Sequence, residues 1–164
     1  MKFIFFTGLM VATLAGFAQN TTTQSFRTTN YAGTYSYGNI EHGARGRAVV
    51  YPESDSTVLV FIDICTSGSS MIGQRYARVT IKNGQGIYYS KKNTDRKGCK
   101  WKLSFDNDVL TIKTLDDCNE CGFGHDLRAD SQYKRKMNIV PTYFTDREGR
   151  RIYFDKTSPE NYTR

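Results

Sequence analysis

The sequence predicts an all-β protein in which about eight antiparallel strands follow one another as a meander, close into a barrel and precede a C-terminal hairpin. Short segments rich in β-branched and aromatic residues recur between turn residues, at the spacing of β-sandwiches and barrels. No window of useful length has the 3.6-residue apolar period of an amphipathic helix. A Greek-key sandwich is the alternative. We expect the barrel because most connections are of hairpin length and closure removes exposed strand edges.

The N-terminus predicts export. Met1-Lys2 is a short positive start, Phe3–Phe17 is an apolar run, and small residues precede Gln19. This pattern is typical of a signal peptide over residues 1–18, cleaved near Ala18, and the run is too short for a transmembrane span. We therefore expect a secreted or periplasmic protein. Residues 19–30, rich in Thr, Ser, Gln and Asn, predict a flexible lead-in.

The barrel domain is expected over residues 31–136. Its first strand alternates around Tyr35 and Tyr37, and its second ends at Pro52. The third contains the run 58–62, the strongest candidate for a central strand. The expected strands are Tyr31–Gly38, Gly43–Tyr51, Ser56–Cys65, Gly73–Lys82, Gln85–Lys92, Gly98–Phe105, Asp108–Thr114 and Cys121–Lys136.

Turn residues separate the later strands. Asn83-Gly84 is a two-residue hairpin signal between the fourth and fifth strands. Trp101 and Leu103 share one face of the sixth strand, and Asp106-Asn107 leads into the seventh. Residues 137–164 form a C-terminal extension with a hairpin of two further strands, expected to pack on the barrel or cap one end.

The cysteines Cys65, Cys99, Cys118 and Cys121 are expected to form disulfides, because export leads to an oxidising compartment. Consecutive strands of a meander alternate in direction, so all four cysteines are expected at one rim. We expect Cys99 to pair with Cys118 and Cys65 with Cys121. The swapped pairing, Cys99–Cys121 with Cys65–Cys118, is nearly as favourable. A zinc site is the competing interpretation, because Cys118 and Cys121 have ligand spacing.

The same rim is expected to carry the longer connections, 39–42, 66–72, 93–97 and 115–120, and loops on a rigid scaffold are common working sites. The formal net charge is +7, and a focused positive field favours an acidic partner. Many basic residues fall on this half of the meander: Arg45, Arg47, Arg75, Lys91, Lys92, Arg96, Lys97 and Lys100.

The segment from Cys99 to Arg135 contains an ordered series of motifs. These are Cys99-Lys-Trp-Lys-Leu-Ser-Phe, Leu110-Thr-Ile-Lys, Cys118-Asn-Glu-Cys121-Gly-Phe-Gly and Ala129-Asp-Ser-Gln-Tyr133-Lys-Arg. The series resembles small secreted bacterial β-barrel domains that end in a Cys-Gly-Phe-Gly segment and are associated with, or likened to, periplasmic lysozyme-inhibitor proteins. The resemblance implies a disulfide-stapled antiparallel barrel and an inhibitor-like role. Ser131 departs from it, because the family usually has Gly there.

These features predict a non-catalytic binding protein that engages a protein or an anionic envelope component through the stapled rim. The candidate binding residues are Ser69, Ser70, Arg75, Tyr76, Arg96 and Lys97. No nucleophile elbow is present, and His42 and His125 are expected to serve no metal. We expect no enzyme activity, cofactor or nucleic-acid partner. The alternatives are a lipocalin-like carrier of a small apolar ligand and a structural envelope protein.

Overall fold

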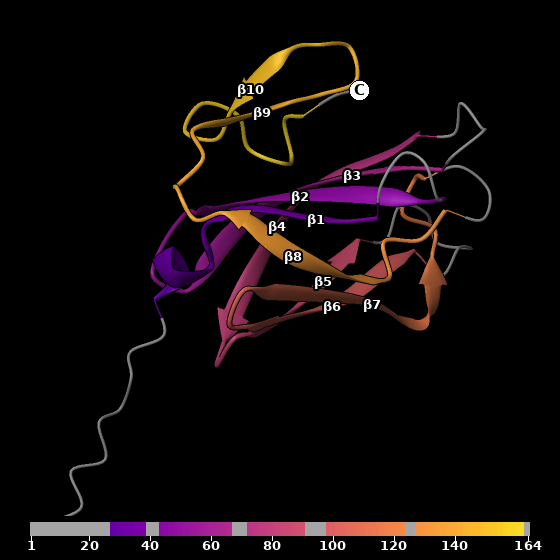
Figure 1. Cartoon of the computed structure of the whole chain (residues 1–164), viewed down its shortest axis with the longest axis horizontal. Coiled ribbons are helices and arrows are strands. Elements are labelled where there is room, and N and C mark those ends of the chain that lie inside the picture. The colour runs from indigo at the N-terminus through magenta and orange to yellow at the C-terminus, as the bar shows by residue number, and fades with distance from the viewer. Residues whose placement is uncertain (1–26, 39–42, 67–71, 91–97, 124–126, 163–164) are drawn as a thin grey trace, which may run out of the picture.

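The structure is a computed structural model that describes residues 27–38, 43–66, 72–90, 98–123 and 127–162 (Figure 1). The predicted signal peptide and most of the predicted lead-in lie outside the described residues. The histidines His42 and His125 lie outside them too.

Eight antiparallel strands form a closed barrel, in which each strand pairs with the next and β8 pairs with β1. This confirms the predicted all-β meander. A separate two-stranded sheet, β9 with β10, follows the barrel. The strands are β1 (Gly33–Tyr37), β2 (Arg45–Pro52), β3 (Thr57–Cys65), β4 (Ile72–Lys82), β5 (Gln85–Ser90), β6 (Cys99–Asp106), β7 (Val109–Asn119), β8 (Ser131–Met137), β9 (Tyr143–Thr145) and β10 (Arg151–Tyr153).

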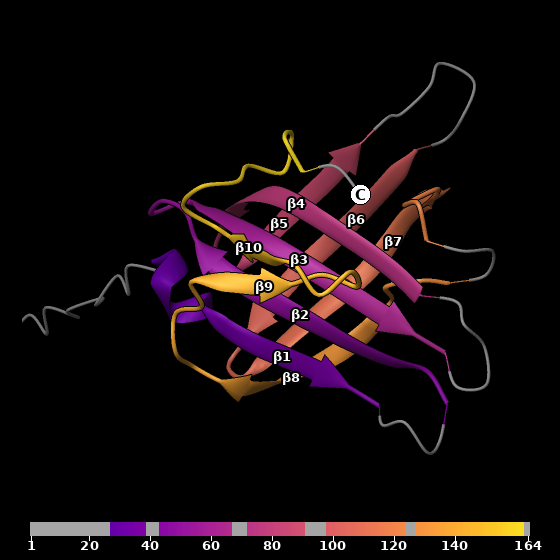
Figure 2. The same ribbon diagram turned by 90° about the horizontal axis from the view of Figure 1, so that it is seen from above.

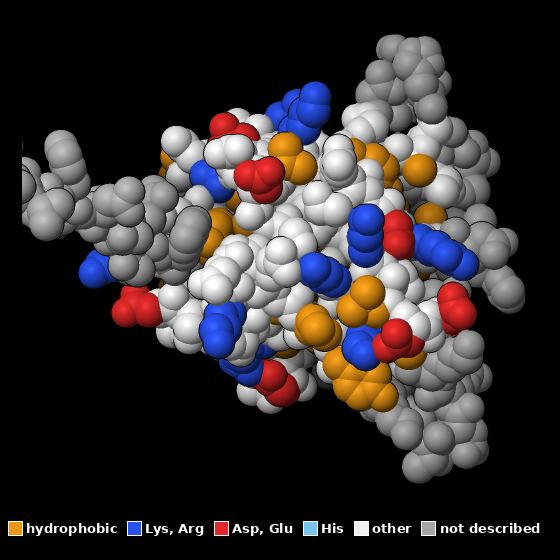
Figure 3. Space-filling view, turned by 90° about the horizontal axis from the view of Figure 1, so that it is seen from below, with side chains coloured by type: hydrophobic (Ala, Val, Ile, Leu, Met, Phe, Trp, Pro, Cys, Tyr) orange, Lys and Arg blue, Asp and Glu red, His pale blue; other side chains and the backbone are white. Residues whose placement is uncertain are grey.

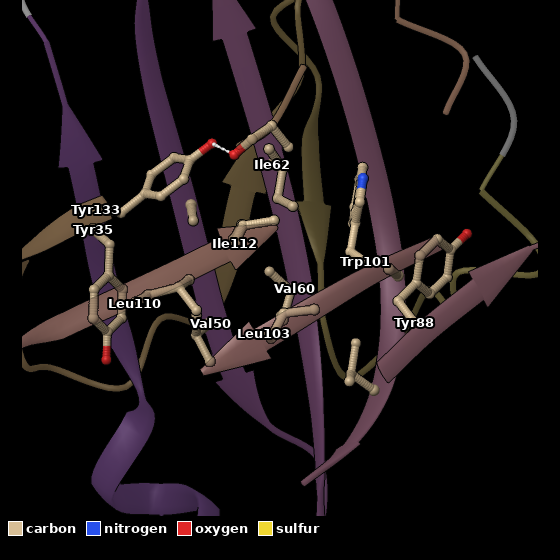
Figure 4. Close-up of a cluster of buried hydrophobic side chains, with 14 of the residues drawn as sticks. Tyr35, Val50, Val60, Ile62, Tyr88, Trp101, Leu103, Leu110, Ile112 and Tyr133 are labelled. Atoms are coloured by element: carbon tan, nitrogen blue, oxygen red, sulfur yellow. Dashed lines mark hydrogen bonds between the residues drawn. The ribbon is translucent and has the colours of Figure 1, made fainter. Parts of the chain in front are cut away.

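Alternate residues of the strands fill the barrel interior, because successive strand side chains point to opposite faces. Tyr35, Trp101 and Tyr133 are the largest fully buried side chains in this interior. Aliphatic residues pack between them, as Figure 4 shows for Val60 and Ile112. The Tyr133 hydroxyl donates a hydrogen bond to the Ala129 carbonyl at 2.9 Å, so this ring satisfies its polar atom inside the core.

Tight turns and a short 3-10 helix, η1 (Thr28–Tyr31), lie at one end of the barrel. Asn83 and Gly84 have positive φ angles of 50° and 74°, as the predicted two-residue hairpin requires. Tyr31 of η1 is 6% exposed and stacks on Phe105 with 4.6 Å between ring centroids. Thr28, within the expected flexible lead-in, is 2% exposed and donates a hydrogen bond to the Ser54 carbonyl, so the end of that lead-in is packed against the barrel.

Strands β7 and β8 have different bounds from those predicted. β7 was expected to end at Thr114 but continues to Asn119. An irregularity allows this extension, because the register shifts between the pair Trp101↔Thr114 and the pair Cys99↔Asn119. Asp116 and Asp117 have positive φ within the extra residues. β8 was expected to begin at Cys121 and begins at Ser131 instead.

The four cysteines lie at the end of the barrel opposite η1, on or next to the ends of β3, β6 and β7. Cys99 and Cys121 form a disulfide with a Cα–Cα distance of 4.5 Å, whereas Cys65 and Cys118 are unbonded. The expected pairs Cys99–Cys118 and Cys65–Cys121 were therefore wrong, whereas the alternative pairing is confirmed for Cys99–Cys121 but not for Cys65–Cys118. Asn119 is the residue that pairs with Cys99, so its neighbour Cys118 directs its side chain to the opposite face of β7.

The C-terminal extension packs on the outer face of the barrel rather than over an end. Figure 2 shows β9 and β10 lying across β2 and β3. Phe144 of β9 stacks on Phe61 of β3 at 3.9 Å between centroids, and both are at most 2% exposed. The second hydrophobic cluster consists of Val49, Leu59, Phe61, Tyr76, Phe144 and Phe154, with Tyr51, Ile152 and Tyr162 against it.

Polar contacts fix the position of the extension. Arg47 donates to the Thr145 carbonyl at 3.1 Å, and Tyr76 donates to the Thr157 carbonyl at 2.9 Å. In the hairpin turn, Asp146 accepts hydrogen bonds from the backbone and guanidinium of Arg150. Burial alone would raise the pKa of Asp146, but these hydrogen bonds outweigh it and lower the pKa below its ordinary value. The extension is thus held by an aromatic cluster and a set of hydrogen bonds.

We predict that Phe144→Ala lowers the free energy of unfolding by about 3–5 kcal/mol, because it removes a buried ring between two others. Ile139→Ala is the control, since Ile139 is 74% exposed, and it should change stability by less than about 0.5 kcal/mol. Chemical denaturation of the two variants measures the difference. Equal stability would show that the extension does not pack as described.

We predict that replacing Cys99 and Cys121 together by alanine costs about 3 kcal/mol of stability, because the bond closes a loop with a sequence separation of 22. Replacing Cys65 and Cys118 together removes no cross-link and should cost less. Peptide mapping of the unreduced protein should find Cys99 linked to Cys121, with Cys65 and Cys118 open to alkylation. A cross-link that includes Cys65 or Cys118 would contradict this pairing.

Candidate functional site

The barrel wall opens between β4 and β5. The ladder of β4 with β3 has nine pairs, from Thr57↔Thr80 to Cys65↔Ile72. The ladder of β4 with β5 has only two, Ile81↔Gly86 and Lys82↔Gln85. Figure 2 shows β4 and β5 meeting at the hairpin turn and spreading apart toward the cysteine-bearing end. Within the described residues, the facing edges of the two strands have no ladder partner beyond the turn.

The direction of the backbone groups follows from the alternation in an antiparallel ladder. Ile81 donates its N–H to the Ser56 carbonyl on the β3 side at 2.7 Å. The residues at even positions of β4, including Tyr76 and Arg78, therefore direct their N–H and C=O groups toward β5. Gln85 pairs with Lys82 across the turn, so its backbone groups face β4. Ile87 and Tyr89 lie two and four residues further along β5, so their N–H and C=O groups also face β4. The opening is thus lined by two strand edges.

A groove of about 650 Å³ occupies this opening. One wall comes from β4, a second from β5, and a third from the C-terminal segment that follows β10. Ile87 and Tyr89 present large apolar side chains here that are 58% and 53% exposed. The lining residues are Arg75, Tyr76, Ala77, Arg78, Thr80, Ile87, Tyr88, Tyr89, Ser90, Pro159, Glu160 and Tyr162.

Arg75 reaches across the opening from β4 to β5. Its Nε and Nη2 donate to the Tyr88 hydroxyl at 2.8 and 2.5 Å, and Nη2 also donates to Ser90 Oγ at 2.8 Å. The guanidinium carbon lies 5.5 Å from the centroid of the Tyr88 ring. Within the described part of the chain, Arg75 has no carboxylate partner. Side-chain contacts therefore connect the two strands where their backbones do not pair.

Arg78, the other cation of the groove, is neutralised. It donates to both carboxylate oxygens of Glu53 at 2.7 Å and to Glu160 at 2.5 Å. The hydrogen bonds with Glu53 are the main cause of an Arg78 pKa above its ordinary value. These contacts hold the C-terminal segment beside β4, so this wall of the groove is tied down.

Trp101 lies in the barrel interior next to the groove. It is 1% exposed, and its ring lies 5.4 Å from that of Tyr88 and 5.6 Å from that of Phe123, measured between centroids. Its Nε1–H has no hydrogen-bond partner among the described residues. Figure 4 shows this nitrogen directed toward the end of the barrel to which β1 points, which is the cysteine-bearing end.

The structure places only two of the six predicted binding residues. Arg75 and Tyr76 are neighbours on β4 and point to opposite faces: Arg75 into the barrel mouth, and Tyr76 outward beneath the C-terminal extension. Tyr76 is 4% exposed, and burial raises the pKa of its hydroxyl. The other four, Ser69, Ser70, Arg96 and Lys97, lie outside the described residues.

Sequence reasoning missed the β5 side of the site. Tyr88, Ser90 and the exposed pair Ile87 and Tyr89 were not singled out. One signal for them was available: on a strand that alternates, Ile87 and Tyr89 fall on the face opposite the inward Tyr88, where polar residues are expected. No sequence pattern indicated that Trp101 lies beside the groove with its N–H unpaired among the described residues, because a tryptophan on the inward face of a strand is typical of any hydrophobic core.

The predicted positive field is weakened where basic residues have carboxylate partners. Arg47 lies 3.6 Å from Asp63, and Lys100 lies 2.5 Å from Asp116. On the face opposite the C-terminal extension, basic and acidic side chains lie interspersed, with hydrophobic side chains between them (Figure 3). Among the described residues, no three His, Cys, Asp or Glu side chains are grouped as a metal site requires.

Comparisons with known proteins add no assignment. No model of a protein family, no curated protein and no solved structure matches this chain. Over the described residues, no helix has the length and apolar character needed to cross a membrane.

We predict that Tyr89→Pro is tolerated while Lys102→Pro is not. The Tyr89 N–H faces the opening, so proline there removes no ladder bond, and proline occurs at such edge positions. Lys102 lies on β6, and its N–H faces β7, so proline removes a ladder hydrogen bond and leaves its acceptor unpaired. Lys102→Pro should therefore cost about 1–3 kcal/mol more than Tyr89→Pro in chemical denaturation. Equal costs would mean that β5 is fully paired in solution.

Proposed function

We propose that this protein is a non-catalytic binding protein, exported to the periplasm or the cell exterior, which binds an extended segment of a partner protein between β4 and β5. The observation that carries the proposal is the ladder of two pairs between strands of eleven and six residues. The segment would add as a strand to one or both of the facing edges. An inhibitor-like role, as the resemblance implies, is one form of such an activity.

Strand addition follows from the chemistry of an exposed sheet edge. Unpaired N–H and C=O groups of a strand form a template for another chain, and proteins usually cover or eliminate such edges. Here the barrel closes between β1 and β8 but leaves the β4 and β5 edges facing a groove. Main-chain hydrogen bonds would supply affinity, and pockets for alternate side chains would supply specificity. Exposed Ile87 and Tyr89 offer apolar contacts for the segment.

The groove supports a binding function better than the barrel interior does. A lipocalin-like carrier needs an internal cavity, whereas Tyr35, Trp101, Leu103 and Tyr133 fill the interior and are at most 1% exposed. The groove lies outside this core, and its volume of about 650 Å³ falls within the usual range for ligand sites, about 300–1,000 Å³.

The test is an unbiased selection of displayed peptides on the immobilised, oxidised protein without residues 1–18. Peptides with alternating patterns should be enriched, and they should protect the amides of Ile87 and Tyr89 from hydrogen exchange. If no peptide is enriched above a protein-free surface, this function is refuted and a structural role is favoured.

A matched pair of variants separates strand addition from contact with the tyrosine ring. Tyr89→Thr removes the ring but keeps the edge N–H, and Tyr89→Pro removes both. We expect Tyr89→Pro to bind a selected peptide about fivefold or more weakly than Tyr89→Thr, the value of one hydrogen bond. Equal affinities would show that the peptide does not pair with β5.

A further inference from the structure

One of the two arginines that line the groove, Arg75, has no acidic partner among the described residues. Arg78 binds two carboxylates, whereas Arg75 binds only the neutral hydroxyls of Tyr88 and Ser90. A guanidinium has five N–H donors arranged to match a carboxylate. The Nε and Nη2 atoms of Arg75 make the hydrogen bonds described above, and Nη1 has no acceptor among the described residues. Arg75 is therefore held in place with donors left over.

A second unused donor lies beside the same tyrosine. The Trp101 ring and the Arg75 guanidinium both lie within 5.5 Å of the Tyr88 ring centroid. The Trp101 N–H is buried and has no partner in the described part of the chain. Buried polar groups are rarely left unpaired, and such a group in a native structure calls for an explanation. Both residues thus have donors that call for an acceptor, and a carboxylate only accepts hydrogen bonds.

The direction of these side chains indicates which part of a bound segment they meet. Arg75 and Tyr88 point into the barrel mouth from the two strands that border the groove. A strand inserted between β4 and β5 would direct every second side chain the same way. Side chains directly opposite on neighbouring strands have Cβ atoms about 4.5–5.5 Å apart. One inward side chain of the segment would thus reach the Arg75 guanidinium.

We propose that the bound segment carries an aspartate or glutamate whose side-chain carboxylate enters the barrel mouth and pairs with Arg75. This inference rests on the proposed strand addition and specifies the partner. The partner is an extended acidic peptide that is recognised through one side chain pointing into the barrel mouth. The carboxylate supplies acceptors for the Arg75 N–H groups that have none among the described residues. A neutral segment would leave the cation without a counter-charge in a partly desolvated site.

The fluorescence of Trp101 reports on binding at this site, because Trp101 is the one tryptophan of the chain and its ring packs against Tyr88. Peptides selected on the wild-type protein should share an acidic residue at one fixed position, and their binding should change the tryptophan emission. Peptides selected on Arg75→Gln should lack that acidic position. If peptides are enriched on the wild-type protein without an acidic position, this inference fails and the strand-addition function stands. If none is enriched, both fail.

A double-mutant cycle measures the pair directly with one selected peptide blocked at both ends. Replacing its acidic residue by the matching amide, or Arg75 by glutamine, should each weaken binding about tenfold or more, as expected for a charge-assisted hydrogen bond. Making both changes should cost little more than either. Additive losses would overturn the pairing, as would binding that requires a free peptide C-terminus.

Two further variants control for folding and for general charge. Arg75→Lys keeps the positive charge but loses the paired N–H donors of the guanidinium. It should therefore still prefer the acidic peptide over the amide peptide, but bind it more weakly. Arg78→Gln should change the affinities for the acidic and amide peptides by the same factor, because Arg78 is already neutralised. Thermal unfolding checks that each variant is folded. A preference lost in Arg78→Gln but kept in Arg75→Gln would overturn the assignment.

Discussion

Pairing between β1 and β8 is the interaction on which the rest of the structure depends, because it converts a meander into a closed wall around one core. Closure directs alternate side chains of every strand inward, where Tyr35, Trp101 and Tyr133 occupy the space. The ladder of this wall is shortest at one place, with two pairs. That place is the seam between β4 and β5, and the groove is a consequence of it.

The two sides of the seam differ in how firmly they are held. β4 pairs with β3 along nine positions, and its outer face is covered by the C-terminal extension through Tyr76 and Arg78. β5 pairs with β6 along six positions, and its outer residues Ile87 and Tyr89 are exposed. One side of the groove is therefore anchored, while the other has fewer contacts to break. A segment that enters the groove would meet a fixed edge on β4 and an adaptable edge on β5.

The elements predicted from the sequence were those with local signals. Alternation and turn residues such as Asn83-Gly84 identified eight barrel strands and the final hairpin. The choice between the two cysteine pairings went wrong because the position of Cys118 depends on the irregularity at Asp116 and Asp117, which shifts the register without a pattern that marks it. Arg75 was chosen as a binding residue and lines the groove. Its neighbour Tyr76 was chosen with it, but is covered by an extension whose docking position no local pattern specifies. The seam was missed for the same reason, since the number of pairs between two strands is a property of the closed barrel.

Strand β3 has one further consequence, because it belongs to two cores at once. Val60 and Ile62 point into the barrel, while Leu59 and Phe61 point into the aromatic cluster under β9 and β10. The backbone of one strand thus separates and supports both. Loss of the barrel core would remove the surface on which the extension folds, and loss of the extension would expose one face of β3 to water. We therefore expect the barrel and its extension to unfold as one cooperative unit rather than as two domains joined in series.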